Sequence, residues 1–297
     1  MKKRFANSMP TGLRNSLRLS VYRSEVLLQR ARFAKINPPA GGWPVLMANS
    51  FPKSGTHLLD QVLMGFSRVA PFSSHVALPF VSYDGETGKK RSVGEALAYV
   101  NSLRPLDVTT AHLLAWPEVV EAVCTPRFIP YLIFRDPRDI VVSHVFFVTE
   151  MAPDHAHYQY YNQNLKSFDE RLKVSILGRP DTDIEFPNIA KRFELYQGWL
   201  ARPEVLVLRF EEFIHQRQDT LGKVVDHFLN RVDTLPSSRD EIIRALEGNI
   251  NPKRSPTFRS GKTGEWKKYF KEEHKTLFKD IAGDLLIQLG YEKDNNW

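Results

Sequence analysis

Four short segments of the sequence carry side chains that suit the binding of anions or the transfer of a proton. The first, residues 52–57, reads Pro-Lys-Ser-Gly-Thr-His and lies between a short apolar run and a helical pattern. A glycine-bearing turn that opens a helix presents unpaired backbone N–H groups and the positive end of the helix dipole to a phosphate. Lys53 adds a mobile cation, and Gly55 lets the backbone come close. The Walker A spacing G-x-x-x-x-G-K-[ST] is absent, and an ordinary strand-to-helix turn is the alternative.

Two further apolar runs are also followed by residues whose side chains could take part in catalysis or anion binding. His112 follows the second run, and its near-neutral pKa suits it to take a proton from a hydroxyl; a purely structural role is the alternative for one of nine histidines. Arg135 follows the third run and precedes a helix that Pro137 would open. Ser143 lies two turns into that helix, so Arg135 and Ser143 suit a second phosphate. Local ion pairs at a solvated helix start would explain the same charges.

The fourth segment, residues 258–266, is a basic loop that contains glycine and precedes a predicted helix. Its Arg259 and its backbone amides could close over an anion. A flexible basic loop without a ligand is the alternative interpretation.

These segments need a scaffold, and the pattern of apolar runs indicates which one. Short apolar runs alternate with helical patterns, which predicts an α/β fold of three layers, with a central parallel sheet and helices on both faces. The expected strands are residues 45–48, 108–110, 131–134 and 205–208. The expected helices are residues 58–66, 117–124, 188–201, 212–229, 237–247 and 265–289, with another through Val142 and Phe146. Ligands of such sheets bind beyond the carboxyl ends of the strands, where three of the four segments fall.

Composition limits the class of protein. The chain has 297 residues, of which 42% are hydrophobic and 25% charged, so one large globular domain can bury a sufficient core. A single cysteine, Cys124, excludes an internal disulfide and a multi-cysteine metal site, and it fits a reducing compartment. No apolar run approaches the roughly 18 residues that span a bilayer, and no secretory signal is evident. We therefore expect a cytoplasmic protein.

The net charge of +7 is concentrated at the two ends of the chain. Residues 1–36 carry nine basic side chains and one acid, whereas residues 37–252 are slightly acidic, so we expect no nucleic-acid partner. The N-terminal segment places Leu13, Leu17, Val21 and Leu28 at roughly helical spacing among arginines. We predict a basic amphipathic segment at 1–36, ahead of a single domain at 37–297. Our hypothesis is that this segment lies on an anionic membrane, as a peripheral contact that would favour a lipid-like acceptor, or on the domain itself.

Together the four segments resemble the cytosolic-type sulfotransferase family, which uses 3′-phosphoadenylyl sulfate (PAPS) and releases 3′,5′-bisphosphoadenosine (PAP). Residues 52–57 resemble its 5′-phosphosulfate motif P-K-S-G-T-T, and residues 135–143 resemble its 3′-phosphate motif R-x-P-[RK]-D followed by V-S. Residues 258–266 resemble F-R-K-G-x-x-G-D-W, and residues 208–212 resemble a later strand end with Y-E-[DE]. The resemblance covers roughly residues 45–270 and implies a P-loop NTPase-like fold.

The resemblance also implies roles. Lys53 would stabilise charge on the leaving phosphate, and His112 would deprotonate the acceptor hydroxyl during direct in-line transfer, with no metal ion. The residues implied to hold the 5′-phosphate are Ser54, Gly55, Thr56 and His57. The residues implied to hold the 3′-phosphate are Arg135, Ser143, Arg259, Ser260 and Gly261. Leu58 stands where many members have a tryptophan against adenine, so we expect the adenine to stack on Phe193 or Trp199 instead.

Two other functions compete with sulfuryl transfer. A P-loop kinase or nucleotide hydrolase would need Mg²⁺ ligands and a lysine at the Walker A spacing. A non-catalytic, PAP-binding and membrane-associated protein would not need His112 and Lys53, which this chain keeps. The acceptor stays open among small alcohols, phenols, glycolipids and sugars. Residues 72–92 and 149–187 are the segments expected to contact it.

Overall fold

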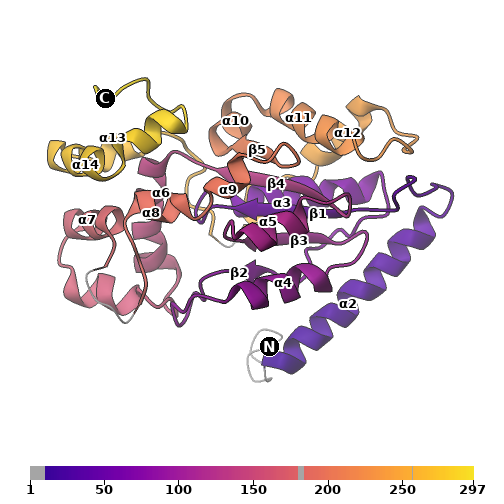
Figure 1. The fold of residues 1–297 in the computed structure, drawn as a ribbon, viewed down its shortest axis with the longest axis horizontal. Helices are drawn as coiled ribbons and strands as arrows, with labels where there is room; N and C mark the ends of the chain where they lie inside the picture. The colour runs from indigo at the N-terminus through magenta and orange to yellow at the C-terminus, as the bar shows by residue number, and fades with distance from the viewer. Residues whose placement is uncertain (1–10, 180–183, 256) are drawn as a thin grey trace.

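The structure is a computed structural model, and it describes residues 11–179, 184–255 and 257–297, with side chains from residue 16 onward within those ranges. Its centre is a sheet of five parallel strands in the order β2-β3-β1-β4-β5. The strands are β1 (Val45–Ser50), β2 (Phe80–Val81), β3 (Val108–His112), β4 (Phe128–Phe134) and β5 (Leu206–Arg209). Figure 1 shows helices on both sides of this sheet, which confirms the predicted three-layer architecture.

The helices fill two layers and one end of the molecule. In the first half of the chain they are α2 (Thr11–Arg32), α3 (Thr56–Met64), α4 (Val93–Ser102), α5 (Pro117–Val123) and α6 (Pro137–Phe146). In the second half they are α7 (Phe168–Leu177), α8 (Ile189–Glu194), α9 (Gln197–Leu200), α10 (Phe210–His215), α11 (Arg217–Leu229), α12 (Arg239–Glu247), α13 (Trp266–Tyr269) and α14 (Glu272–Gln288). Short 3-10 or π turns lie at 65–68, 147–151, 160–164 and 252–254.

Alternate residues of the fully buried strand β1 supply the two halves of the core. Val45 and Met47 face a cluster shared with α4, α5, α6 and α14, whereas Leu46 and Ala48 face a cluster shared with α2, α3, α11 and α12. Because β1 is buried on both faces, its sequence begins with a continuous apolar run instead of alternating apolar and polar residues.

Three of the predicted helices are interrupted. The stretch 188–201 forms α8 and α9, the stretch 212–229 forms α10 and α11 on either side of Gln216, and the stretch 265–289 forms α13 and α14. Gln216 has non-helical backbone angles (φ −136°, ψ 47°), so the chain turns there although its composition favours a helix. Sequence periodicity did not reveal these breaks because each part keeps its own apolar face.

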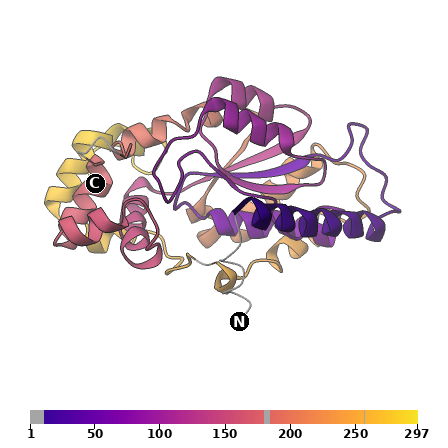
Figure 2. The same ribbon diagram turned by 90° about the horizontal axis from the view of Figure 1, so that it is seen from below.

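The N-terminal helix α2 packs on the domain through a face other than its leucines. Tyr22 and Val26 are buried, the Tyr22 hydroxyl accepts from the backbone N–H of Val108, and Arg23 pairs with Asp107. Of the residues that the sequence pattern placed on its apolar face, Leu17, Val21 and Leu28 are instead 49%, 72% and 71% exposed, and the side chain of Leu13 lies outside the described part of the chain. Figures 1 and 2 show α2 along the outside of the domain. Over the described ranges, no helix is long and apolar enough to cross a membrane.

Candidate active site

The loop after β1 is shaped to bring backbone amides toward a ligand. Gly55 caps α3 with a left-handed backbone (φ 99°), and a Cβ there would come within 2.6 Å of the Phe210 ring, so only glycine fits. Lys53 also has a positive φ of 70°, which is strained for a residue with a side chain. The backbone amides of Thr56 and His57 have no backbone acceptor among the described residues, whereas those of Leu58 and Leu59 bond to the Gly55 carbonyl. The loop and the helix start therefore have the geometry that suits an anion.

His112, at the end of β3, has a fixed tautomer. Its Nδ1 lies 2.8 Å from the carbonyl oxygen of Ser50, which can only accept, so Nδ1 carries the proton. The other ring nitrogen, Nε2, therefore has a lone pair for a proton. Burial lowers the pKa of His112 below its usual value, because the charged form is poorly solvated there. At neutral pH the side chain is a neutral imidazole that can act as a base.

Lys53 presents a cation that no carboxylate within the described ranges neutralises. Its Nζ lies 3.8 Å from the centre of the Phe147 ring. Burial, followed by the charges of Arg135 and Arg259, lowers the pKa of Lys53 to about 8. Of these three cations, Arg135 pairs with Asp139 and Arg259 pairs with Glu265. Lys53 is therefore the one whose charge has no acidic partner within the described ranges, and that charge favours the binding of an anion.

Arg135 connects the third strand end to the basic loop at 258–266. Its Nη2 donates to Asp139 (3.0 Å) and to the carbonyl of Lys262 (2.6 Å), and its guanidinium lies 4.8 Å from the Phe210 ring. Within the loop, Glu265 accepts from Arg259 and from the Ser260 hydroxyl. The loop is thereby held against the start of α6.

Asp139 is the carboxylate that holds this arrangement, and its replacement should destabilise the protein. It is buried and accepts from the backbone N–H groups of Gly264 (2.8 Å) and Trp266 (2.9 Å) as well as from Arg135. In Asp139→Asn one of these donors loses its acceptor and Arg135 loses its counter-charge. We expect the free energy of unfolding to fall by about 3–5 kcal/mol, measured by urea denaturation.

The control is Asp226→Asn, which removes an exposed ion pair with Arg239. Exposed pairs contribute about 0–1 kcal/mol, so this variant should unfold close to the wild type. Equal losses in the two variants would show that Asp139 has no special structural role.

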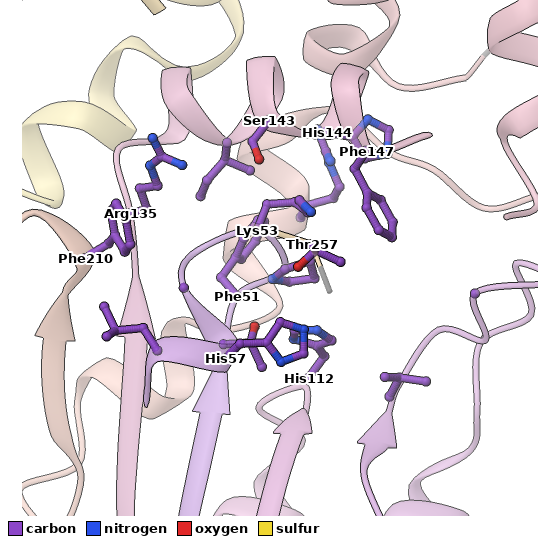
Figure 3. A pocket seen from close by; sticks show the side chains of 18 of the residues that line it. Phe51, Lys53, His57, His112, Arg135, Ser143, His144, Phe147, Phe210 and Thr257 are labelled. Atoms are coloured by element: carbon purple, nitrogen blue, oxygen red, sulfur yellow. The ribbon is translucent and has the colours of Figure 1, made fainter. Parts of the chain in front are cut away.

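A single pocket of about 530 Å³ collects these groups. Figure 3 shows Lys53 between Arg135 and Phe210 on one side and His144 and Phe147 on the other. The sequence-predicted residues that line this pocket are Lys53, Gly55, Thr56, His57, Leu58, His112, Arg135, Ser143, Arg259, Ser260 and Gly261. Segments that are far apart in the sequence thus meet at the carboxyl ends of the strands.

Three residues predicted to act here lie outside the pocket lining. Ser54 is fully buried beneath the loop. Phe193 is buried and stacks on Phe51, with ring centres 4.0 Å apart, and Trp199 is buried and donates its indole N–H to the carbonyl of Leu113. The structure therefore places both proposed adenine-stacking rings in the core rather than at the cavity.

Other pocket residues gained no role from the sequence. Phe210 lies beside Gly55 of the loop at residues 52–57. It opens α10 directly after β5, so its position at a strand end was an available signal. A second group, made of Phe147, His155, His157 and Phe186, lines the side of the pocket near His144. His155, His157 and Phe186 lie in the predicted acceptor segment at residues 149–187, and Phe147 precedes it, but their common orientation depends on tertiary packing.

Comparison with known proteins shows which family this chain resembles in sequence and in structure. The sequence profile of the sulfotransferase domain matches residues 45–290. No curated protein sequence matches the chain. Among solved structures, mouse sulfotransferase SULT7A1 complexed with PAP is similar at a TM-score of 0.55 and 16% identity, over 90% of each chain. Retinol dehydratase in complex with androsterone and the inactive cofactor PAP is similar at a TM-score of 0.54 and 14% identity, over 89% of this chain and 85% of that one.

The structural likenesses confirm the predicted P-loop-like α/β fold. The profile match covers most of the chain, including all five strands and the segments at residues 52–57, 135–143 and 258–266. The chain belongs to the sulfotransferase-domain family.

Proposed function

We propose that this sulfotransferase moves the sulfuryl group of PAPS to a hydroxyl group of an acceptor, with His112 as general base. One observation carries the proposal most: the pocket joins an anion-binding loop, an unpaired lysine and a histidine whose Nε2 can accept a proton. PAPS supplies an activated sulfuryl group when it is bound. The chain's own residues then need to position two reactants and stabilise charge.

The site has an unmet hydrogen bond that suits a phosphate group. Arg135 lines the pocket, and its Nε is buried without a hydrogen-bond partner among the described residues. A buried polar atom without a partner costs about 1–3 kcal/mol, which a phosphate oxygen would relieve. We assign the 5′-phosphate to residues 53–57 and the 3′-phosphate to Arg135, Ser143 and the loop at Arg259, Ser260 and Gly261.

Lys53 and His112 would have separate roles in the transfer reaction. Lys53 would stabilise the negative charge that develops on the departing phosphate oxygen, because no acid among the described residues pairs with its ammonium group. His112 Nε2 would receive the acceptor's proton, and the bond from Nδ1 to the Ser50 carbonyl would hold the ring and steady the resulting imidazolium. Apolar side chains beside the loop, including Leu58 and Phe210, offer surfaces for the adenine.

The direct test is a transfer assay with sulfur-labelled PAPS and four acceptor classes: small alcohols, phenols, glycolipids and sugars. The proposal predicts a labelled product from at least one class, with PAP formed in equal amount. Release of free sulfate with every class would instead indicate a hydrolase. Absence of any turnover with a protein that binds PAP would favour the non-catalytic alternative.

The outward face of α2 suggests a location for this activity, and we propose that it contacts an anionic membrane surface. Leu17, Val21 and Leu28 are exposed on this face, opposite the packed Tyr22 and Val26. The helix's one acid, Glu25, is occupied by hydrogen bonds from Ser74 and His75. The face therefore combines apolar side chains with arginines and no available acid, which suits a surface of acidic phospholipids.

Replacing Leu17, Val21 and Leu28 together by glutamine should weaken vesicle binding. A leucine-sized side chain contributes about 1.5–3 kcal/mol when fully buried, so we expect a loss of at least about tenfold in partitioning, even with partial insertion. The measurement is co-sedimentation with vesicles of phosphatidylserine and phosphatidylcholine, compared with phosphatidylcholine alone. Binding should also fall as salt rises, because the arginine contribution is screened.

A matched control replaces three exposed apolar side chains on other elements, namely Leu177, Leu200 and Ile287. This variant should bind vesicles like the wild type. If the two triple variants bind equally, or if the wild type does not bind acidic vesicles, α2 is not a membrane contact.

A further inference from the structure

A half-buried arginine lines the pocket away from the proposed phosphate-binding loops. Arg192, on α8, donates through Nη2 to the carbonyl of Ser175, and its Cζ lies 4.3 Å from the centre of the Phe186 ring. Its Nε is buried without a hydrogen-bond partner, and within the described ranges no carboxylate pairs with it. Burial lowers the pKa of Arg192 to about 10, as expected for a cation without a counter-charge. Removing a cation from water without giving it a counter-charge is energetically costly. The position of Arg192 is therefore suited to receive an anionic group.

The side chains around Arg192 do not supply that anion. The ring of His144 stacks on Phe186 at 4.8 Å, and the ring of His157 lies 4.5 Å from Phe186. Burial lowers the pKa of His144 well below its usual value and that of His155 to about 4, so both are neutral at pH 7. This part of the pocket is therefore a largely aromatic wall that Arg192 lines, and Arg179 lies behind it with its Nη1 3.0 Å from His157 Nδ1.

Among the described residues, two carboxylates line the same pocket, and both already have partners. Glu185 accepts from the Tyr83 hydroxyl at 2.9 Å and lies 3.7 Å from Lys90. Asp84 accepts from the backbone and hydroxyl of Thr87 and lies 3.7 Å from Arg91. These acids are satisfied by their own neighbours, and neither forms an ion pair with the arginine.

A continuous wall connects this arginine to the proposed reaction centre. Lys53 Nζ contacts the Phe147 ring at 3.8 Å, and the Phe147 ring lies 5.6 Å from that of His155. From Lys53 to Arg192 the wall runs through Phe147, His155, His157 and Phe186. An acceptor whose hydroxyl reaches His112 would lie along this wall with its far end toward Arg192.

We propose that Arg192 is the binding subsite for an acidic group on the acceptor, so that the preferred acceptors are hydroxy acids with an apolar or aromatic body. The inference rests on the proposed function, because it assumes that this part of the pocket receives the acceptor. A guanidinium presents its N–H groups in a planar fork that matches a carboxylate. The aromatic wall provides the surface against which the acceptor's body packs.

The test compares each acid with its own amide, which has nearly the same shape and no charge. The probes are 3-(4-hydroxyphenyl)propanoate and 12-hydroxydodecanoate with their carboxamides, and binding is measured by calorimetry with and without saturating PAP. A charge-assisted hydrogen bond contributes about 1.5–3 kcal/mol, so we expect at least one acid to bind roughly tenfold or more tightly than its amide. In Arg192→Gln this preference should vanish, and in Arg192→Lys part of it should return.

The matched control is Arg171→Gln, because Arg171 also donates to backbone carbonyls, those of Tyr161 and Leu165, without lining the pocket. It should keep the preference for the acid. Thermal unfolding of each variant shows whether a loss of binding reflects a loss of folding, and Arg192→Lys provides the comparison if Arg192→Gln unfolds. Equal binding of acid and amide by the wild type, or a preference that survives in Arg192→Gln, would overturn the subsite.

The measurement without PAP separates this inference from the proposed function. If PAP fails to bind but the acid preference depends on Arg192, the nucleotide assignment is wrong and the anion subsite stands. If PAP binds and both acids bind no better than their amides, the subsite is wrong and the nucleotide assignment stands.

Discussion

Replacing His112 by asparagine should lower kcat by about 10²–10⁴-fold while leaving the affinity for PAP unchanged. The amide of asparagine can still donate to the Ser50 carbonyl, which now accepts from His112 Nδ1 at 2.8 Å, but it cannot take up a proton. The fall in kcat would therefore reflect the missing proton acceptor and not a change in the position of the strand end. Steady-state turnover and calorimetry with PAP measure the two effects separately.

The pH dependence gives a second readout for the same residue. Burial lowers the pKa of His112, so the neutral, basic form persists below the usual histidine value. We expect kcat/KM to be flat near pH 7 and to fall only as the pH drops below about 6.5. His75→Asn is the control, because His75 is exposed and pairs with Glu25 outside the pocket. A His112→Asn enzyme that retains more than a tenth of wild-type turnover would remove His112 from the role of base.

Replacing Lys53 by methionine should also be severe, with a loss of about 10²–10³-fold in kcat, typical of removing one donor that stabilises developing charge. Methionine keeps an unbranched apolar side chain of nearly the same length but lacks the ammonium group and its contact with the Phe147 ring. Lys223→Met, which removes a lysine paired with Glu212 on the surface, is the matched control and should turn over normally. Single-turnover kinetics with labelled PAPS would isolate the chemical step.

Lys53 should also leave a signature in stability. Burial, followed by Arg135 and Arg259, lowers its pKa to about 8 in the folded protein, whereas an unfolded lysine titrates near about 10.4. Between these values the unfolded state binds more protons, so the Lys53 contribution to the free energy of unfolding rises with pH. Lys53→Met should therefore be more stable than the wild type at pH 7, with a gap that narrows from pH 8 to 10. A gap independent of pH would contradict this account of Lys53.

The sheet and the main anion-binding groups were predictable because their causes are local. A strand buried on both faces must be a short apolar run, as β1 and β4 are. The residues after such strands project into the cleft of a parallel sheet, and this placed Lys53, His112 and Arg135 at one pocket before their contacts were known.

The aromatic contacts were not predictable because they join distant parts of the chain. Phe193 matched a family aromatic by position, but it stacks on Phe51, which follows β1. Phe210 lies beside Gly55 because of the sheet order, in which β4 lies between β1 and β5. Nothing in the local sequence decides which of two phenylalanines packs in the core and which faces the cavity.

The prediction of which face of α2 packs on the domain was wrong for a related reason. The helix has two apolar faces, and the leucine face is the more evident one in the sequence. The face that packs is instead the one where Arg23 pairs with Asp107 and Glu25 accepts from Ser74, around Tyr22 and Val26. This face packs because its polar side chains find partners more than 45 residues away in the sequence. The periodicity of the helix contains no information about those partners.

The central claim is that the pocket is built for a nucleotide with phosphates at both the 3′ and 5′ positions. Calorimetry with PAP, adenosine 5′-phosphate and ATP, all without added metal, tests it most directly. The account predicts one PAP per chain, bound at least about tenfold more tightly than adenosine 5′-phosphate, because a charged hydrogen-bonding group contributes about 1.5–3 kcal/mol. PAP should also bind more tightly than ATP. Equal affinities for PAP and adenosine 5′-phosphate, or a preference for ATP, would contradict it.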